Sequence, residues 1–193
     1  MRRLKLVIPD SNYKNQVLSR LTKNFKADII GRLLTMGYNE PIILEGPYSE
    51  AFLVNSKQLS IIKDLIAVGK HPYCSGIHIA TIFGRVKKRI EYSLAFTELL
   101  LKIGLRRSII VINDWGERLV LYGRDVLAGS IIDIYPPIYK GSNVIIVNRN
   151  FEFIGIGKSL YSFKEIMKLR ENNPQKVVVK NKRDLGWYLR RGM

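Results

Sequence analysis

Three short stretches between residues 121 and 159 decide the fold class: LYGRDVLAGS (121–130), KGSNVIIV (140–147) and FIGIGKS (153–159). Glycines beside short apolar runs are typical of strands that are joined by tight turns. The flanking sequence predicts further strands at 108–112, 131–134 and 177–180, a turn at 113–116 and a short helix at 117–122. Several short strands at fairly regular spacing indicate a small barrel or sandwich.

The first hundred residues have a different pattern. Apolar residues recur at helical spacing over 17–34, and strands are predicted at 41–44, 51–54, 77–83 and 89–94. Two more helices are expected, one over 56–68 with Ser56 as its N-cap and one over 96–103. We therefore predict an α+β protein with an N-terminal domain (1–105), a C-terminal domain (106–188) and a short basic tail (189–193).

The charge of the chain is strongly positive. It contains 32 Lys and Arg residues against 16 Asp and Glu residues, a formal net charge of +16. A field of this sign favours a polyanionic partner, with nucleic acid as the first candidate, an anionic membrane surface as the second and acidic proteins as the third.

Cys74 is the single cysteine, so an internal disulfide is excluded and a reducing compartment is indicated. The N-terminus has no long apolar core of the kind that a signal peptide needs. The most apolar stretches are far too short to span a bilayer. We expect a soluble cytoplasmic protein that is monomeric and has no membrane association.

The three glycine-containing stretches resemble, in order, three sequence blocks of PUA domains. Residues 121–130 are similar to a helix-to-strand turn, 140–147 to a "KGD-V-V-V" strand and 153–159 to a "G-I-G-x-A" strand. Ser142 and Asn143 stand where the second block usually has an acidic residue.

Sequence outside these blocks resembles one family in particular. The stretch 51–68, the segment FGRV (83–86) and the ending DLGWYLRR (184–191) are similar to the "nuclear import protein seven" family of ribosome-assembly factors, in its archaeal form. The likeness covers roughly residues 42–191. It implies an α/β N-terminal domain with an antiparallel sheet, followed by a PUA pseudo-barrel.

The same resemblance implies a function. It indicates a non-catalytic role in the maturation of large-subunit pre-rRNA, with a preference for uridine-rich RNA. Members of that family also contact other assembly factors and, in some cases, the RNA-degrading exosome.

The residues that we expect to bind RNA are basic. PUA domains usually bind RNA with the helix and turn after the first strand and with the last strand. These positions, together with one lysine after the paired glycines, supply the set Arg118, Arg124, Lys158, Lys176, Lys180, Lys182 and Arg183. If 177–180 is a strand, its period of two places Lys176, Val178 and Lys180 on one face. The alternative is that these cations are merely solvated.

Aromatic side chains and a second group of cations are ambiguous. Each of Trp115, Tyr122, Tyr135 and Tyr139 either stacks on a base or packs in the protein, and packing is the favoured interpretation for Trp115. A second basic patch is expected at a hairpin tip and consists of Arg85, Lys87, Lys88 and Arg89. It extends the RNA footprint, meets an acidic partner or is a solvated turn.

Metal and catalytic chemistry find little support in the sequence. His71, Cys74 and His78 give three possible ligands without a fourth, whereas a structural zinc site uses four. Carboxylates are scattered, and the phosphate-loop, zinc-protease and serine-hydrolase motifs are absent. We predict neither metal nor cofactor, and no enzymatic activity.

Three hypotheses follow from these patterns. The first is a non-catalytic RNA-binding assembly factor, supported by the charge and the PUA-like blocks. The second is an RNA-modifying enzyme, since PUA domains often accompany catalytic domains. The third is an adaptor whose basic surface contacts an acidic protein of the RNA-processing machinery.

Overall fold

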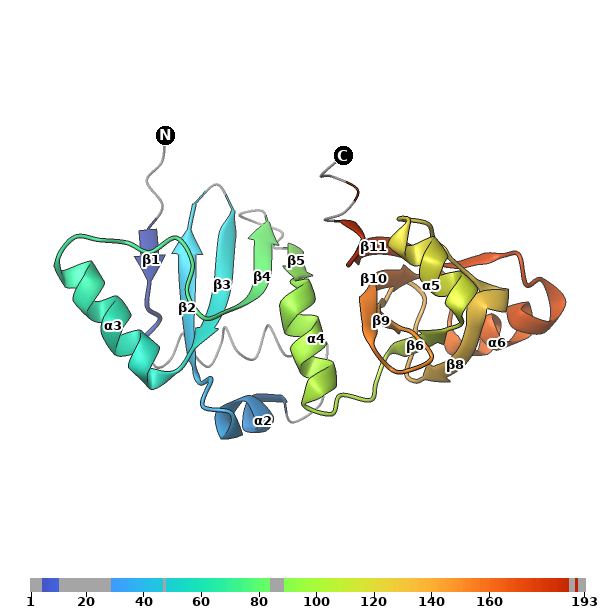
Figure 1. The fold of residues 1–193 in the computed structure, drawn as a ribbon, viewed down its shortest axis with the longest axis horizontal. Helices are drawn as coiled ribbons and strands as arrows, with labels where there is room; N and C mark the ends of the chain where they lie inside the picture. The colour runs from blue at the N-terminus through green and yellow to red at the C-terminus, as the bar shows by residue number, and fades with distance from the viewer. Residues whose placement is uncertain (1–4, 11–28, 47, 84–88, 188–189, 191–193) are drawn as a thin grey trace. The chain divides into compact units, whose positions relative to one another are not determined.

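The computed structural model describes residues 5–10, 29–46, 48–83, 89–187 and 190 of the 193-residue chain. The chain divides into two units, Met1–Ile103 and Gly104–Met193 (Figure 1). Each unit combines one sheet with helices, which confirms the expected α+β class.

The N-terminal unit is built on an antiparallel sheet of five strands in the order β1-β2-β3-β4-β5. These strands are β1 (Lys5–Val7), β2 (Glu40–Glu45), β3 (Ser49–Val54), β4 (Ile77–Phe83) and β5 (Arg89–Tyr92). The described residues of this unit also form the helices α2 (Ile29–Thr35), α3 (Ser56–Ala67) and α4 (Leu94–Lys102). The antiparallel sheet and the strands after residue 40 confirm the predictions, whereas 17–28 of the expected first helix lie outside the described residues.

The core of this unit forms between the central strands and α3. Ile42 and Phe52 from β2 and β3 pack with Ile62 of the helix, and all three are buried. Asn55, not Ser56, is the N-cap of α3, because its side chain accepts a hydrogen bond from the Gln58 amide at 2.8 Å. Both residue types cap helices well, so composition alone did not separate them.

The C-terminal unit contains a mixed, curled sheet of six strands in the order β7-β11-β10-β9-β6-β8 (Figure 1). The strands are β6 (Ile109–Ile112), β7 (Val126–Leu127), β8 (Ile131–Tyr135), β9 (Asn143–Val147), β10 (Phe153–Ser159) and β11 (Val177–Asp184). Only β6 and β9 pair in parallel; the other neighbours are antiparallel. Helices α5 (Asp114–Leu121) and α6 (Phe163–Asn172) and the short 3-10 helix η1 (Ala128–Ser130) complete the unit.

One local prediction for this unit was wrong, and one helix was not predicted. The turn expected at 113–116 is the start of α5, because the Asn113 side chain accepts a hydrogen bond from the Gly116 amide and caps the helix. Helix α6 was not predicted, although Ser162 and Glu165 form a capping box at its start. That pair, three residues apart before an apolar position, was the signal that could have found the helix.

Candidate nucleic-acid interface

The C-terminal end of α5 closes with a Schellman motif. The Gly123 amide donates to Val120 O at 2.8 Å, and the Arg124 amide donates to Leu119 O at 2.9 Å. Gly123 takes φ +81°, the left-handed conformation that this motif requires and that side chains disfavour. The motif therefore holds Tyr122 and Arg124 at defined positions on either side of the glycine.

Tyr122 and two arginines gather at this helix end. Arg118 lies four residues before Tyr122, so that both occupy the same face of the helix end. The Tyr122 side chain is 74% exposed, and both Arg118 and Arg124 are exposed. Within the described part of the chain, neither arginine forms an ion pair. A ring beside two free guanidinium groups is suited to stacking on a base and binding its phosphates.

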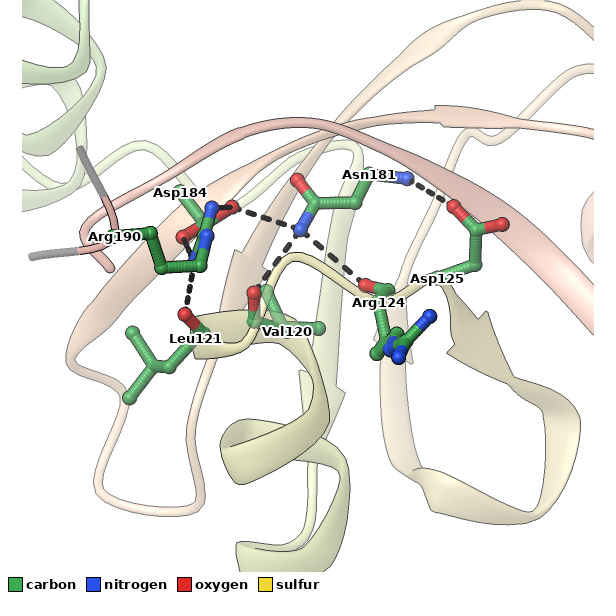
Figure 2. A network of polar contacts seen from close by, with 7 residues as sticks. All are labelled: Val120, Leu121, Arg124, Asp125, Asn181, Asp184 and Arg190. Atoms are coloured by element: carbon green, nitrogen blue, oxygen red, sulfur yellow. Dashed lines mark hydrogen bonds and ion pairs between the residues drawn. The ribbon is translucent and has the colours of Figure 1, made fainter. Parts of the chain in front are cut away.

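A network of polar contacts supports this helix end from the side of β11, with Asn181 at its centre (Figure 2). The Asn181 side-chain amide donates to Val120 O, Arg124 O and Asp184 Oδ2 at 3.1, 3.3 and 2.9 Å. Its backbone amide donates to Asp125 Oδ1 at 3.0 Å. All three partners of the side-chain nitrogen are acceptors, so the orientation of the amide is determined by its surroundings.

Asp184 and Arg190 form the second half of the network. The Asp184 carboxylate is 2% exposed and accepts two hydrogen bonds of 2.9 Å from the Arg190 guanidinium. Arg190 also donates to Leu121 O, next to Gly186, where a Cβ atom would meet that oxygen at 2.0 Å. The hydrogen bond to Asp184 raises the pKa of Arg190 above its ordinary value.

Lys180 lies on β11 beside the same loop but is not free. Its ammonium group forms an ion pair with Asp125 at 2.6 Å, and its side chain remains 55% exposed. Lys158 on β10 is exposed and lies directly opposite Lys180 in the antiparallel register. These two predicted residues are therefore neighbours, and both are near the loop that carries Arg124.

The other predicted cations are spread along β11. Lys176 precedes the strand and is exposed, while Lys182 and Arg183 lie near its far end. The prediction that Lys176, Val178 and Lys180 share one face is wrong, because Val178 is fully buried. The register shifts between Val177 and Val179, and such a β-bulge interrupts the alternation of faces.

Several residues of this site were missed by the sequence reasoning. Asn181, Asp184 and Arg190 support the helix end, and Asp125 pairs with Lys180. The signal available in the sequence was an acidic residue, Asp184, at the end of a basic strand. Its burial in the structure explains why it is paired, since buried charges need a partner. Tyr135 packs edge-on against Phe151, with ring centroids 5.4 Å apart.

The structure also bears on the second basic patch, on metal ligands and on membrane-spanning helices. Of the second basic patch, Arg85, Lys87 and Lys88 lie outside the described residues, and Arg89 opens β5 opposite Phe83. In the described ranges, no three His, Cys, Asp or Glu side chains cluster as metal ligands would. The same ranges contain no helix that is long and apolar enough to cross a membrane.

Comparison with known proteins finds similarity over the C-terminal unit and over most of the chain. A family model described as "UPF0113 PUA domain" matches residues 108–193. A UPF0113 protein from Archaeoglobus fulgidus is 34% identical over 149 residues, which is 77% of each chain.

Solved structures show the same fold. A conserved PUA domain protein from Thermoplasma acidophilum superposes with a TM-score of 0.63 at 15% identity, over 97% of this chain and 99% of that one. A hypothetical protein from Pyrococcus horikoshii gives 0.60 at 17% identity, over 96% and 99%. Given the family model and the 34% identity to the Archaeoglobus relative, the chain belongs to the UPF0113 family, and its C-terminal unit is a PUA domain, a type of RNA-binding domain.

Proposed function

We propose that this protein binds single-stranded RNA at the end of α5 and the adjacent part of β11. One observation carries the proposal: the exposed Tyr122 follows Arg118 by one helical turn and precedes Arg124 by two residues, and both arginines are exposed without an acidic partner among the described residues. Base stacking on an aromatic ring contributes on the order of 1–3 kcal/mol, and each phosphate contact adds a salt-dependent term. The net charge of +16 favours the approach of a polyanion.

We further propose that the protein is a non-catalytic ribosome-biogenesis factor that binds uridine-rich pre-rRNA during large-subunit assembly. This proposal is supported by the resemblance to the archaeal branch of the "nuclear import protein seven" family over residues 42–191. The partners in this proposal are pre-rRNA and, through other surfaces, assembly factors or the exosome. The protein acts as a cytoplasmic monomer in this proposal.

The binding proposal is tested with a fluorescent oligouridine and a variant that combines Tyr122→Ala, Arg118→Gln and Arg124→Gln. We expect the affinity to fall at least tenfold, because stacking and two phosphate contacts are lost together. The slope of log K against log salt should become shallower by about 0.7 for each cation that is lost.

The matched control removes one exposed tyrosine and two exposed cations elsewhere: Tyr73→Ala, Lys164→Gln and Lys168→Gln. Both variants carry the same net charge, so a general electrostatic effect would weaken both equally. Equal affinities for the two variants, or no binding of oligouridine by the unaltered protein, would show that the proposed site is wrong.

A further inference from the structure

We propose that the RNA-binding surface crosses the sheet from β11 to β9, rather than following β11, and ends at a second stacking residue, Tyr139. This inference rests on the proposed binding at Tyr122 and extends it across the sheet, in a direction that the sequence did not indicate. The ligand that fits it is a single strand of RNA whose bases are unstacked at both ends of the path.

The path is set by strand register. Lys158 on β10 lies opposite Lys180 on one side and opposite Asn143 of β9 on the other. Val179 lies opposite Val126, which places Asp125 beside Lys180 at the next position. We call this line of four residues the cross-strand rung: Asp125, Lys180, Lys158 and Asn143.

Residues of one rung share a face of the sheet. Side chains that lie directly opposite each other in antiparallel strands point to the same side, about 5 Å apart. Lys180, Lys158 and Asn143 are all exposed, in agreement with this geometry. Three polar side chains thus follow one another across β11, β10 and β9. This line runs at right angles to β11, along which the sequence predicted the RNA-binding residues.

The rung leads to the turn between β8 and β9, where Tyr139 is 66% exposed. The Ser142 amide donates to Tyr139 O at 3.0 Å, and the Ser142 hydroxyl donates to the same oxygen at 2.8 Å. Gly141 takes φ +80°, which a type II turn requires at its third position. The backbone of Tyr139 is therefore held while its ring is presented to solvent, which lowers the entropy cost of stacking.

This turn is adjacent to the rung in space as well as in sequence. A Cβ atom on Gly141 would lie 3.9 Å from the Lys158 side chain, and the Gly141 amide donates to Ser159 O at 2.7 Å. The turn that carries Tyr139 and Lys140 thus pairs with β10 at Ser159, one position from Lys158, and lies next to the Asn143 end of the rung, while the loop with Tyr122 and Arg124 leads into its Asp125 end.

The charge along this path is predominantly positive. Its exposed cations are Arg118, Arg124, Lys180, Lys158 and Lys140. Two carboxylates face them: Asp125 pairs with Lys180, and Glu165 is held mainly by the Ser162 hydroxyl and amide. Those hydrogen bonds and, to a smaller extent, the charge of Lys140 lower the pKa of Glu165. Five cations against two carboxylates leave the path attractive to phosphates.

An aromatic ring at each end selects for a single strand. A base can stack on a protein ring only where it has left its own stack, and a regular duplex hides both faces of every base. Cations between the rings match the phosphates of the intervening nucleotides. A strand that is too short to span the rung can occupy only one of the two rings.

The experiment compares the binding of a two-nucleotide and a ten-nucleotide oligouridine to the unaltered protein, Tyr139→Ala and Tyr122→Ala. We expect Tyr139→Ala to weaken the long oligomer about 5-fold or more, because one stacked base is lost. The short oligomer should lose much less in that variant than in Tyr122→Ala. Lys158→Gln should flatten the salt slope for the long oligomer by about 0.7. Tyr73→Ala and Lys168→Gln are the matched controls.

The outcomes separate the two proposals. If the unaltered protein binds neither oligomer, the proposed function fails, and this inference fails with it. If it binds, and Tyr122→Ala weakens it while Tyr139→Ala and Lys158→Gln behave like the controls, only the path across the sheet is overturned. A loss that is confined to the long oligomer supports the path.

Discussion

The loop near one end of the cross-strand rung and the turn near its other end each carry an exposed tyrosine and a basic residue, but different kinds of contact hold them in place. At one end, the loop with Tyr122 and Arg124 is held by Asn181 and Arg190, which lie far along the chain. At the other end, Tyr139 is held within a four-residue turn that its own neighbour, Ser142, closes.

This difference shows that the position of an exposed aromatic residue can be determined either by contacts far along the chain or by contacts within one turn. The end at α5 depends on a buried carboxylate, whereas the turn depends on its own backbone and one serine hydroxyl. Changes in the network should therefore alter the first end and leave the second unaffected.

The largest effect is expected from Asp184→Ala. Its carboxylate is buried and accepts hydrogen bonds from both Asn181 and Arg190, so its loss removes two acceptors of Arg190 and one of the three acceptors of the Asn181 side chain. The free energy of unfolding of the PUA domain should fall by about 2–3 kcal/mol. Both tryptophans of the chain, Trp115 and Trp187, lie in this unit, so that urea denaturation followed by tryptophan fluorescence reports on it alone.

The control for this stability effect is Asp114→Ala. Asp114 pairs with Arg149 at 2.8 Å, but both side chains are more than half exposed. Exposed pairs contribute about 1 kcal/mol or less, so this variant should be clearly more stable than Asp184→Ala. Equal losses in the two variants would contradict the role that we assign to the buried carboxylate.

The next effect is measured in RNA binding and is expected from Arg190→Gln, which also leaves the buried Asp184 carboxylate without its charged partner. Arg190 faces Asp184 and Leu121 O, so it supports the loop and is not expected to bind a phosphate. The affinity for oligouridine should fall about 3- to 10-fold, because only part of the hydrogen-bond energy that Arg190 gives to the loop, about 1.5–3 kcal/mol for each bond to a charged group, acts on the position of the site. Its salt slope should stay unchanged, whereas Arg118→Gln should flatten it by about 0.7.

Double variants test the supporting role of Arg190 further. Arg190→Gln combined with Tyr122→Ala should lose less affinity than the sum of the single losses, because both act on one stacking site. Arg190→Gln combined with Tyr139→Ala should be additive. A flatter salt slope in Arg190→Gln would instead make this arginine a phosphate contact and contradict the supporting role.

The elements of the fold were largely readable from local patterns. Residues 77–83 were predicted as a strand with the bounds that β4 has, and the runs of 131–134 and 144–147 each fall within a strand. Alternation and glycine punctuation are properties of neighbouring residues, and therefore a single sequence carries them. Helix α6 was missed because its polar composition hid its apolar positions.

The sequence predicted the basic residues of the site but not which of them lie close together. Register and bulges decide which cations become neighbours, and neither can be read from one sequence. The bulge at Val178 turned an expected exposed face into a buried one, while Lys158 and Lys180 came together from strands 22 positions apart. Arg190 was expected in a basic tail. Its hydrogen bond to Leu121 O joins residues 69 positions apart, and no periodic pattern in the sequence predicts a contact over that separation.

The smallest expected effect, and an opposite one, concerns Asp125→Asn. The substitution keeps an oxygen that can accept from the Asn181 amide but removes the charge that pairs with Lys180. Exposed ion pairs contribute about 0.2–1 kcal/mol, so releasing Lys180 to a phosphate should raise the affinity for oligouridine by up to about 5-fold. The salt slope should steepen, and stability should change by less than about 1 kcal/mol.

The control for a general effect of charge is Asp133→Asn. Asp133 is an exposed residue of β8 whose carboxylate accepts a hydrogen bond from the Ile134 amide. An equal gain in the control would mean that the rung is not the path of the RNA, because a specific contact of Lys180 would then make no difference.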